Sequence, residues 1–346
     1  MNIRCSLLLM FFAWHSVLSA ATYETVEKSI NTSCAVQEID ELIIDNQYGN
    51  VVVTDLEQDS IYVNVIIKVT SKNQSGVDQI LNKVKIHFQQ NGKQLKAETS
   101  IDNLNLKNAS LEINYNVVIP ASKKLEIINK YGNVQVAKLE AEGKFDLKYG
   151  NLTGGEWKTS HKIPINVSYG NVNIEEVTNA AAELSYGDMN IGKIENLYLN
   201  SKYSDVNITE GQQVQFYSKY DKFKGGKIGT INSEAKYTDF KIEHLTDGAN
   251  VITSYGNIAV REVLPSADSL MFELRYTNVK LGLGANAYHL DCEGRYSTVK
   301  LGDGRKFNGL WKTEGNYLQL KGEVGDNPQK LTLRINANYG DINLAY

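Results

Sequence analysis

The stretch Tyr131-Gly132-Asn133-Val134-Gln135-Val136 decides the fold, because versions of it recur along most of the chain. A tyrosine, a two-residue corner and a short apolar alternation return every 17 to 22 residues. An isolated early copy begins at Tyr48. The later copies begin at Tyr149, Tyr169, Tyr186, Tyr203, Tyr220, Tyr237, Tyr255, Tyr276, Tyr296, Tyr317 and Tyr339. A period of this size is typical of stacked repeat proteins, in which each repeat contacts its neighbours.

The residues around each corner alternate as β-strands do. Leu197, Leu199 and Tyr203 share one parity before a corner, and Val206 and Ile208 restart the alternation after it. The tyrosine therefore shares a face with aliphatic residues, and we expect that face to be buried as an aromatic core ladder. The opposite orientation would instead expose a long aromatic stripe suited to binding a glycan or a protein.

Two architectures use such a unit: an antiparallel meander with Gly-Asn hairpin turns, or a parallel β-helix in which each period is one coil. Thr238 and Thr277 occupy the glycine position in two copies, and a β-branched residue is poorly suited to the positive φ of a type II′ turn. An open sheet of more than about twenty strands would also exceed ordinary sizes. We therefore predict an all-β fold, a single-stranded parallel β-helix of about 17–22 residues per coil. Asn133, Asn151 and Asn171 should form an amide ladder at its corner.

The chain divides by pattern into residues 1–20, 21–120 and 121–346. Residues 1–20 combine a positive start, an apolar run and small residues near Ala20, as a secretory signal peptide does. Residues 21–120 hold the first coil and a strand–helix–strand insertion or cap, with a helix expected over Ser75–Phe88 and capped by Ser75. Strands are expected over Ile61–Val69, Lys93–Ser100 and Leu111–Ile119. Residues 121–346 are the repeat β-helix.

Composition limits the classes of function. The 346 residues are 42% hydrophobic and 22% charged, which is typical of a globular protein. The formal net charge of −4 gives no electrostatic case for nucleic acid. No apolar stretch after the signal peptide reaches transmembrane length. We expect an exported protein, periplasmic or on the cell surface.

No catalytic motif emerges, and we predict no catalytic, cofactor-binding or metal-ligating residues and no cofactor. Asp188, Asp205, Asp221 and Asp239 lie at successive corners, where a calcium ion would offset their repulsion. The alternative, which we favour, is solvated turn aspartates screened by nearby Lys202, Lys219 and Lys236.

Other chemistry-bearing residues are scattered. His87, His161, His244 and His289 show no ligand spacing. Glu156 and the pair Glu175-Glu176 are interpreted as solvated loop charge. Trp157 and Trp311 are the best candidates for stacking on a carbohydrate. Cys292 is expected to be a small buried residue, and whether Cys34 pairs with it is left open.

The signal peptide, the early Tyr48-Gly49-Asn50 coil, the stretch Val117-Val118-Ile119-Pro120 and the repeat together resemble the bacterial adhesin-like parallel β-helix families of the cell envelope. These include the auto-transporter adhesin head (GIN) domain and related uncharacterised envelope proteins. The resemblance covers about Leu42 to Leu344 and implies a β-helix without an established enzymatic activity. The regular recurrence of tyrosine at each corner is a departure from this resemblance, because the looser relatives often lack it.

The first functional hypothesis is a non-enzymatic, adhesin-like envelope protein whose partner is an unknown glycan or envelope protein. The second is a polysaccharide-active lyase or hydrolase, since parallel β-helices also host such enzymes. An acidic cluster with arginine converging in a groove would favour the enzyme. A purely structural role is the third.

Overall fold

The computed structural model describes residues 8–10, 23–104, 106–328 and 330–345. The predicted signal peptide lies outside the described residues, apart from a short strand, β1 (Leu8–Met10). The chain separates into two compact units, residues 1–174 (unit 1) and 175–346 (unit 2), which we describe in turn. Strand β14 (Val172–Ser185) contains the point of division.

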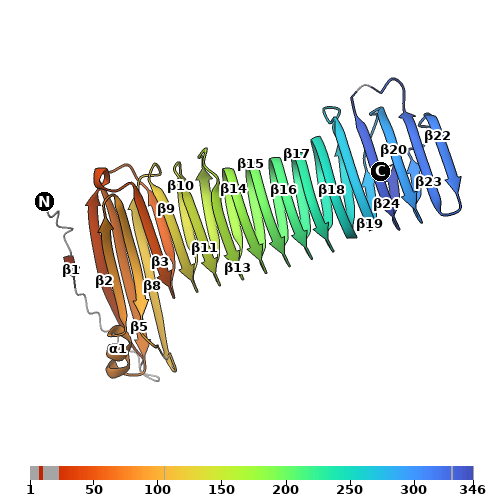
Figure 1. Cartoon of the computed structure of the whole chain (residues 1–346). Helices are drawn as coiled ribbons and strands as arrows, with labels where there is room; N and C mark the ends of the chain where they lie inside the picture. Colours follow the sequence, from red (N-terminus) through yellow and green to blue (C-terminus); the bar gives the residue numbers. More distant parts are fainter. Residues whose placement is uncertain (1–7, 11–22, 105, 329, 346) are drawn as a thin grey trace. The chain divides into compact units, whose positions relative to one another are not determined.

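Successive coils of unit 2 lie side by side in parallel (Figure 1). Asp188 pairs with Asp205, Asp205 with Lys222 and Lys222 with Asp239, so each coil advances the chain by one repeat. The coils are β15 (Asp188–Lys202), β16 (Asp205–Lys219), β17 (Lys222–Lys236) and β18 (Asp239–Val263). The all-β, parallel β-helix prediction is confirmed.

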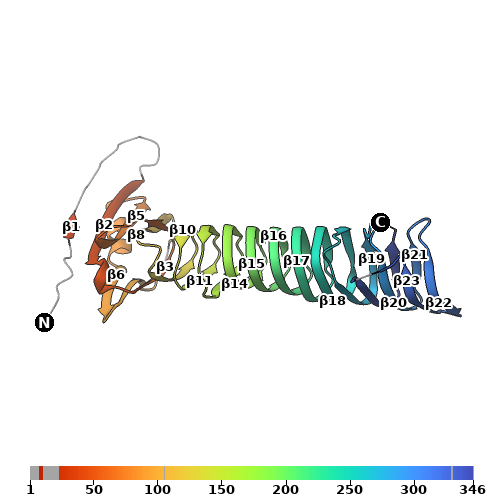
Figure 2. The same ribbon diagram turned by 90° about the horizontal axis from the view of Figure 1, so that it is seen from above.

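Each coil wraps around a strip of aliphatic core. In β15, Met189, Ile191, Ile194, Leu197 and Leu199 are buried. Strict alternation breaks only around Gly192 and Glu195, where the inter-coil pairing also skips a residue. The chain bends there from one wall of the coil to the other, and Figure 2 shows the successive coils from above, lying one beside the next.

The orientation predicted for the tyrosines is wrong. Twelve of them have φ between 50° and 63°, and eleven of these are 41–56% exposed. A residue in the left-handed region turns its side chain away from the direction that strand alternation implies. The aliphatic residues before each corner therefore point inward, and the tyrosine points outward.

Unit 1 builds its coils from shorter strands in two walls. One wall has the order β6-β7-β3-β9-β11-β13, and the other β2-β5-β8-β4-β10-β12. Their bounds are β2 (Glu24–Ala35), β3 (Glu41–Gln47), β4 (Val51–Asp55), β5 (Ser60–Ser71), β6 (Val84–Asn91), β7 (Gln94–Ile101), β8 (Ala109–Ile119), β9 (Lys124–Lys130), β10 (Val134–Leu139), β11 (Gly143–Lys148), β12 (Leu152–Trp157) and β13 (Ile163–Ser168). A 3₁₀ turn (Val36–Glu38) joins β2 to β3.

The segment expected as an insertion or cap lies against the first coil of unit 1. Strands β7 and β8 pair in parallel with β3 and β4, whereas β5 and β6 run antiparallel to their neighbours. The helix is shorter than expected: α1 (Gln74–Leu81) is capped by Asn73, whose side chain accepts a hydrogen bond from the Gly76 amide at 2.9 Å. Val84, expected in the helix, begins strand β6. An insertion of this kind covers the end of a stack, as repeat proteins require.

The C-terminal part of unit 2 is not stacked in chain order. It comprises β19 (Ser269–Leu281), β20 (Tyr288–Arg295), β21 (Thr298–Leu301), β22 (Phe307–Glu314), β23 (Tyr317–Val324), β24 (Thr332–Asn338) and β25 (Asp341–Leu344). Strand β24 lies between β19 and β20, and β25 lies between β19 and β21. The coil that comes last in this sequence is thus inserted between two earlier coils.

Tyr317 does not begin a coil, which corrects the repeat assignment there. It is the first residue of β23 and lies opposite Glu314 across a two-residue turn, Gly315-Asn316. Gly315 has φ +56°, which suits the first central position of a tight hairpin turn. The hairpin rejected as a general solution is therefore used at this end of unit 2, and a two-residue turn, Gly92-Lys93, also joins β6 to β7 in unit 1.

Candidate binding surface

The outward tyrosines of unit 2 form one continuous stack. Neighbouring ring centroids are 4.7–5.0 Å apart and the ring planes are within 10° of parallel. The order along this unit 2 tyrosine stack is Tyr186, Tyr203, Tyr220, Tyr237, Tyr255, Tyr276, Tyr339 and Tyr296. Each ring covers the face of the next, so the stack presents ring edges and phenol hydroxyls to solvent along most of its length.

Unit 1 has a shorter stack of the same kind. Tyr48, Tyr131, Tyr149 and Tyr169 follow one another at 5.0–5.2 Å. The Lys148 ammonium lies 5.4 Å from the Tyr149 ring centroid, within cation–π distance.

A row of cations runs along one side of the unit 2 tyrosine stack. Lys202, Lys219 and Lys236 pair in register on neighbouring coils, and Lys219 lies 5.5 Å from the Tyr220 ring centroid. Arg275 and Arg295 occupy the same position further along, on either side of Asn338. The two arginines and three lysines are exposed.

Amide and carboxylate groups line the other side of the corner. In unit 1 the predicted amide ladder is confirmed: Asn133 Oδ1 accepts from both nitrogens of Asn151 at 3.0 Å, and Asn151 Oδ1 accepts from the Asn171 amide at 2.8 Å. In unit 2, Asn257 donates to Asp239 in the same way at 2.9 Å. The tyrosine stack of unit 2 therefore lies between hydrogen-bond donors and acceptors.

The four corner aspartates do not form one stack. Asp188 and Asp205 pair in register, but Lys222 takes the next position before Asp239, and its Nζ lies 4.0 Å from Asp205. Asp221 is not a solvated turn residue, because it occupies the glycine position of its corner and is buried. Calcium bridging is thus opposed by an intervening lysine.

Buried Asp221 is held by four donors. Ser201 Oγ donates at 2.6 Å and Ser218 Oγ at 2.8 Å, and the amides of Ser204 and Lys219 donate at 2.8 and 3.3 Å. Burial raises the pKa of this carboxyl, and the four hydrogen bonds oppose that rise. These hydrogen bonds fill the corner after Tyr220, where Asp221 stands in place of the usual glycine.

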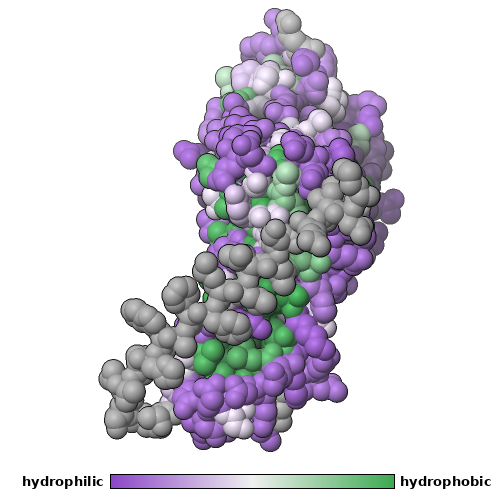
Figure 3. All heavy atoms as spheres, turned by 90° about the vertical axis from the view of Figure 1, so that its left-hand side faces the viewer, coloured by the Kyte–Doolittle hydropathy of each residue, from purple (hydrophilic) through white to green (hydrophobic). Residues whose placement is uncertain are grey.

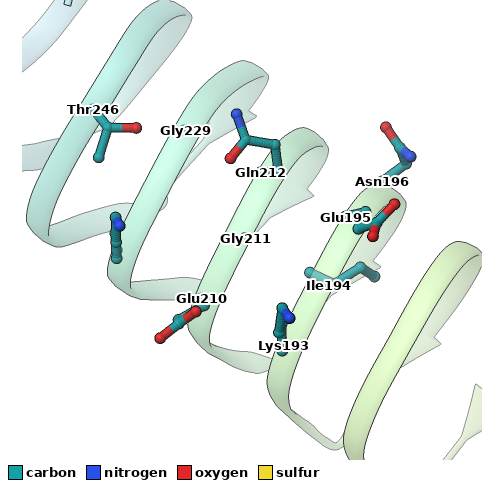
Figure 4. A pocket seen from close by; sticks show the side chains of 10 residues that line it. Lys193, Ile194, Glu195, Asn196, Glu210, Gly211, Gln212, Gly229 and Thr246 are labelled. Atoms are coloured by element: carbon teal, nitrogen blue, oxygen red, sulfur yellow. The ribbon is translucent and has the colours of Figure 1, made fainter. Parts of the chain in front are cut away.

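A shallow hollow of about 360 Å³ lies where the coils bend (Figure 4). Lys193, Glu210 and Lys227 line it and pair in register across three coils, so the glutamate lies between two lysines. No arginine is among its lining residues. The lysines and the glutamate in this row have opposite charges that offset one another. The hollow therefore lacks the acidic cluster with arginine that was expected in the groove of a polysaccharide-active enzyme.

The two tryptophans singled out from the sequence have opposite environments. Trp157 is fully buried, stacks on Phe145 at 4.7 Å and donates its indole N–H to the Val136 carbonyl at 3.1 Å. It is a core residue, so its proposed role in carbohydrate stacking is wrong. Trp311 is 54% exposed on β22 and remains available.

Two hollows lie near the β20–β23 pairing, and the first of them adjoins Trp311 and the end of the unit 2 tyrosine stack. The first, about 320 Å³, is lined by Tyr296, Val299, Trp311 and Tyr317 together with Thr313 and Leu320 among others. The second, about 440 Å³, is lined by Glu293, Gly294, Arg295, Tyr317, Asn336 and Asn338. Sequence reasoning missed this convergence, because it depends on the insertion of β24 and on the β22–β23 hairpin.

Histidines and cysteines add no cluster. His244 lies 3.0 Å from Glu262, and His289 lies 3.7 Å from Glu323, each as an exposed pair. Cys292 is a buried free thiol, as expected, and burial raises its pKa to about 12. Cys34 is also buried. Across residues 8–10, 23–104, 106–328 and 330–345, no three His, Cys, Asp or Glu side chains gather as a metal site would need.

Hydrophobic residues are also visible on the N-terminal side of unit 1, between hydrophilic borders (Figure 3). Tyr23, Leu56 and Tyr62 are the large hydrophobic residues outside the tyrosine stack that are most exposed in the described part of this unit. Within the described part of the chain, no helix is both long and apolar enough to span a bilayer.

No known protein family and no curated protein matches the sequence. Among solved structures, a candidate cell adhesion protein of Clostridium sporogenes is 13% identical over 92% of this chain and 98% of its own, with a TM-score of 0.20. Candidate adhesins of Parabacteroides distasonis and Parabacteroides merdae are each 12% identical. They cover 73% and 74% of this chain and 97% of their own, with TM-scores of 0.33 and 0.34. Likenesses this distant carry no argument about what the chain binds.

Proposed function

We propose that the chain is an exported, adhesin-like β-solenoid of the bacterial cell envelope that binds an extended partner and catalyses no reaction. The exposed unit 2 tyrosine stack carries this proposal. Eight aromatic side chains on a surface, none of them needed to fill the core, form a larger aromatic stripe than soluble proteins usually expose. The adhesin-like resemblance of the sequence points the same way.

The regularity of the stripe fits a polymeric partner. Most coils of unit 2 repeat a phenol hydroxyl between a cationic or polar side chain and an amide or carboxylate; Lys222 and Thr298 are the exceptions. A glycan chain or an extended envelope protein would meet similar groups at successive coils, so weak contacts would add along its length. The cell surface or the periplasm is the compartment in which the predicted signal peptide would place such a protein.

Binding is tested with the chain purified without its predicted signal peptide, using immobilised bacterial envelope polysaccharides and intact bacterial cells. The variant with Tyr203, Tyr220 and Tyr237 all changed to Phe keeps the stacked rings and removes three hydroxyls. A lost hydrogen bond costs about 0.5–1.5 kcal/mol, so we expect binding to weaken by about tenfold or more. Tyr62→Phe, which changes an exposed tyrosine outside the stack, is the matched control.

The same purified protein is incubated with neutral and anionic polysaccharides, and the release of reducing ends or unsaturated products is followed. We expect none. Depolymerisation of any of these polymers would overturn the non-enzymatic part of the proposal, and unchanged binding by the triple variant would overturn the role of the stack.

A further inference from the structure

On the C-terminal side of unit 2, one wall of the β-helix extends further along the stack than the other. One wall continues from β24 through β20 to β23 and β22, whereas the other stops at β21 after β25. Within residues 175–328 and 330–345, neither β22 nor β23 has a counterpart on the shorter wall. The inner face of the β22–β23 hairpin therefore overhangs an open notch, which is the 320 Å³ hollow described above.

Aromatic rings border this notch on two sides. Tyr296 ends the unit 2 tyrosine stack and is its most exposed member, at 56%. Tyr339 stacks on Tyr296 at 4.7 Å, and no other described ring does so, which leaves the second face of Tyr296 open to the notch. Everywhere else along the stack, ring faces are shared between neighbours.

Trp311 supplies the second aromatic surface. It lies opposite Leu320 in the β22–β23 pairing, so it shares the inward face of the hairpin with that buried residue. It is nevertheless 54% exposed, because no strand among the described residues faces it across the notch. The Phe307 ring meets it edge-on at 5.8 Å.

Polar groups surround these rings. Ser297, Thr298, Thr313, Asn316 and Tyr317 line the notch together with these rings. Flat apolar rings beside hydroxyls and an amide match a ligand that has an apolar C–H face and a rim of hydroxyl groups.

We infer that the notch binds a pyranose unit of a polysaccharide, with its C–H face against Trp311 or the free face of Tyr296 and its hydroxyls toward the polar groups. This inference rests on the proposed binding function and names the ligand class and the place where one sugar is held. The volume of the notch, about 320 Å³, lies within the range of small-molecule sites, about 300–1,000 Å³.

A protein strand fits the notch less well. A stable protein interface involves about 20–30 residues on each partner, whereas eleven residues line the notch. The outer strand β22 also carries Lys312 and Glu314, paired at 2.9 Å, and charges on an edge strand discourage the addition of another strand.

The test uses tryptophan fluorescence. The chain without residues 1–20 keeps only Trp157, which is fully buried, and Trp311, so acrylamide quenches mainly Trp311. The probes are gluco-, galacto- and chito-oligosaccharides and oligogalacturonate. We expect at least one class to protect Trp311 from quenching in a saturable manner. By calorimetry, Trp311→Ala should weaken that binding by at least tenfold, and Trp311→Phe by less.

Leu310→Ala is the matched control. Leu310 is the next residue on the same edge strand and is 50% exposed, but it lies opposite Lys321 and so on the outer face. It should leave sugar binding unchanged, while circular dichroism confirms that all variants are folded.

Three results would overturn the inference: no oligosaccharide protects Trp311; Trp311→Ala binds sugar as well as the parent protein; or protection follows protein concentration and self-association in sedimentation. If no oligosaccharide protects Trp311 while the parent protein still binds whole cells through the tyrosine stack, the notch fails while the proposed function stands. If no variant or parent protein binds cells or polysaccharide at all, both fail.

Discussion

At the scale of single residues, the corner tyrosine has an unfavourable left-handed backbone conformation, and the stacking of its ring on its neighbours offsets that cost. A left-handed backbone costs a residue other than glycine about 1–2 kcal/mol. Two stacked neighbours return about 0.5–1.5 kcal/mol each beyond the area they bury. Tyr237, for example, has ring neighbours at 4.8 and 4.9 Å. An aromatic side chain is therefore favoured at a position whose backbone alone would favour glycine or asparagine.

The error about tyrosine orientation has the same origin. Alternation assigns Leu197, Leu199 and Tyr203 to one face only if every residue from Leu197 to Tyr203, including Tyr203 itself, is extended. The positive φ at Tyr203 breaks that condition. Nothing in the local pattern marks it, since tyrosine is a common strand residue and is uncommon in the left-handed region.

Asp221 should make stability depend on pH. Its pKa is raised above the ordinary value of 3.8 by burial, so the folded state holds a proton that the unfolded state has already lost. Its contribution to the free energy of unfolding is thus largest below pH 3.8 and falls as pH rises toward the folded-state pKa. The stability advantage of the parent over Asp221→Asn should shrink across this window, measured by urea unfolding from about pH 3 to pH 7.

Asp205→Asn is the control for this experiment, because Asp205 is a corner aspartate that is not buried. An Asp221→Asn difference that is constant or grows with pH would contradict the assignment of a raised pKa.

At the scale of elements, the corner depends on close approach between coils. A Cβ added at Gly150 would overlap the carbonyl oxygen of Gly132 in the preceding coil, and Gly132 stands in the same relation to Gly49. Where Ser204, Asp221 or Thr238 replaces this glycine, a polar network fills the corner instead. Glycine is thus required at some coils, and its replacement at others is matched by partners.

Gly150→Ala should therefore destabilise strongly, by about 3 kcal/mol or more, because backbone atoms cannot move away cheaply. Gly284→Ala is the comparison: Gly284 has φ +50° but no atom within 4 Å of its added Cβ, so about 1 kcal/mol is expected. Chemical denaturation of both variants gives the two values. Equal losses would show that backbone conformation, not inter-coil contact, sets the requirement.

Much of the element structure was predictable. The apolar alternation gave the strands, and Thr238 and Thr277 correctly favoured a coil over a hairpin. The order of coils at the C-terminal side was not, because β20 and β24 carry similar alternation and either can pair with β19. The candidate site had the same limit. Trp311 was identified from the sequence, but its position beside Tyr296 and Leu320 depends on that strand order and on the β22–β23 hairpin.

At the scale of the whole molecule, each coil of a unit contacts its neighbours and little else. Stability in such arrays is close to a sum of coil and interface contributions. A single free energy of unfolding is then a poor description of the chain, and damage should remain local.

Tyr237→Ala tests this locality. Loss of two stacking partners should cost about 1–3 kcal/mol. By hydrogen exchange, amides of β16, β17 and β18 should lose protection, whereas those of β20 and β23 should keep it. A uniform loss across unit 2 would indicate that the unit opens as one cooperative body.

The insertion of β24 and β25 between β19 and the β20–β21 coil has a consequence for synthesis and export. Residues 288–301 emerge first, but their neighbour consists of residues 332–344. Until those later residues arrive, Tyr276 and Tyr296 lack the ring that joins them, Tyr339. The region cannot mature from one end to the other as it is made. A chain interrupted after β23 would present an unfilled gap, and quality-control proteases could distinguish it from the finished protein.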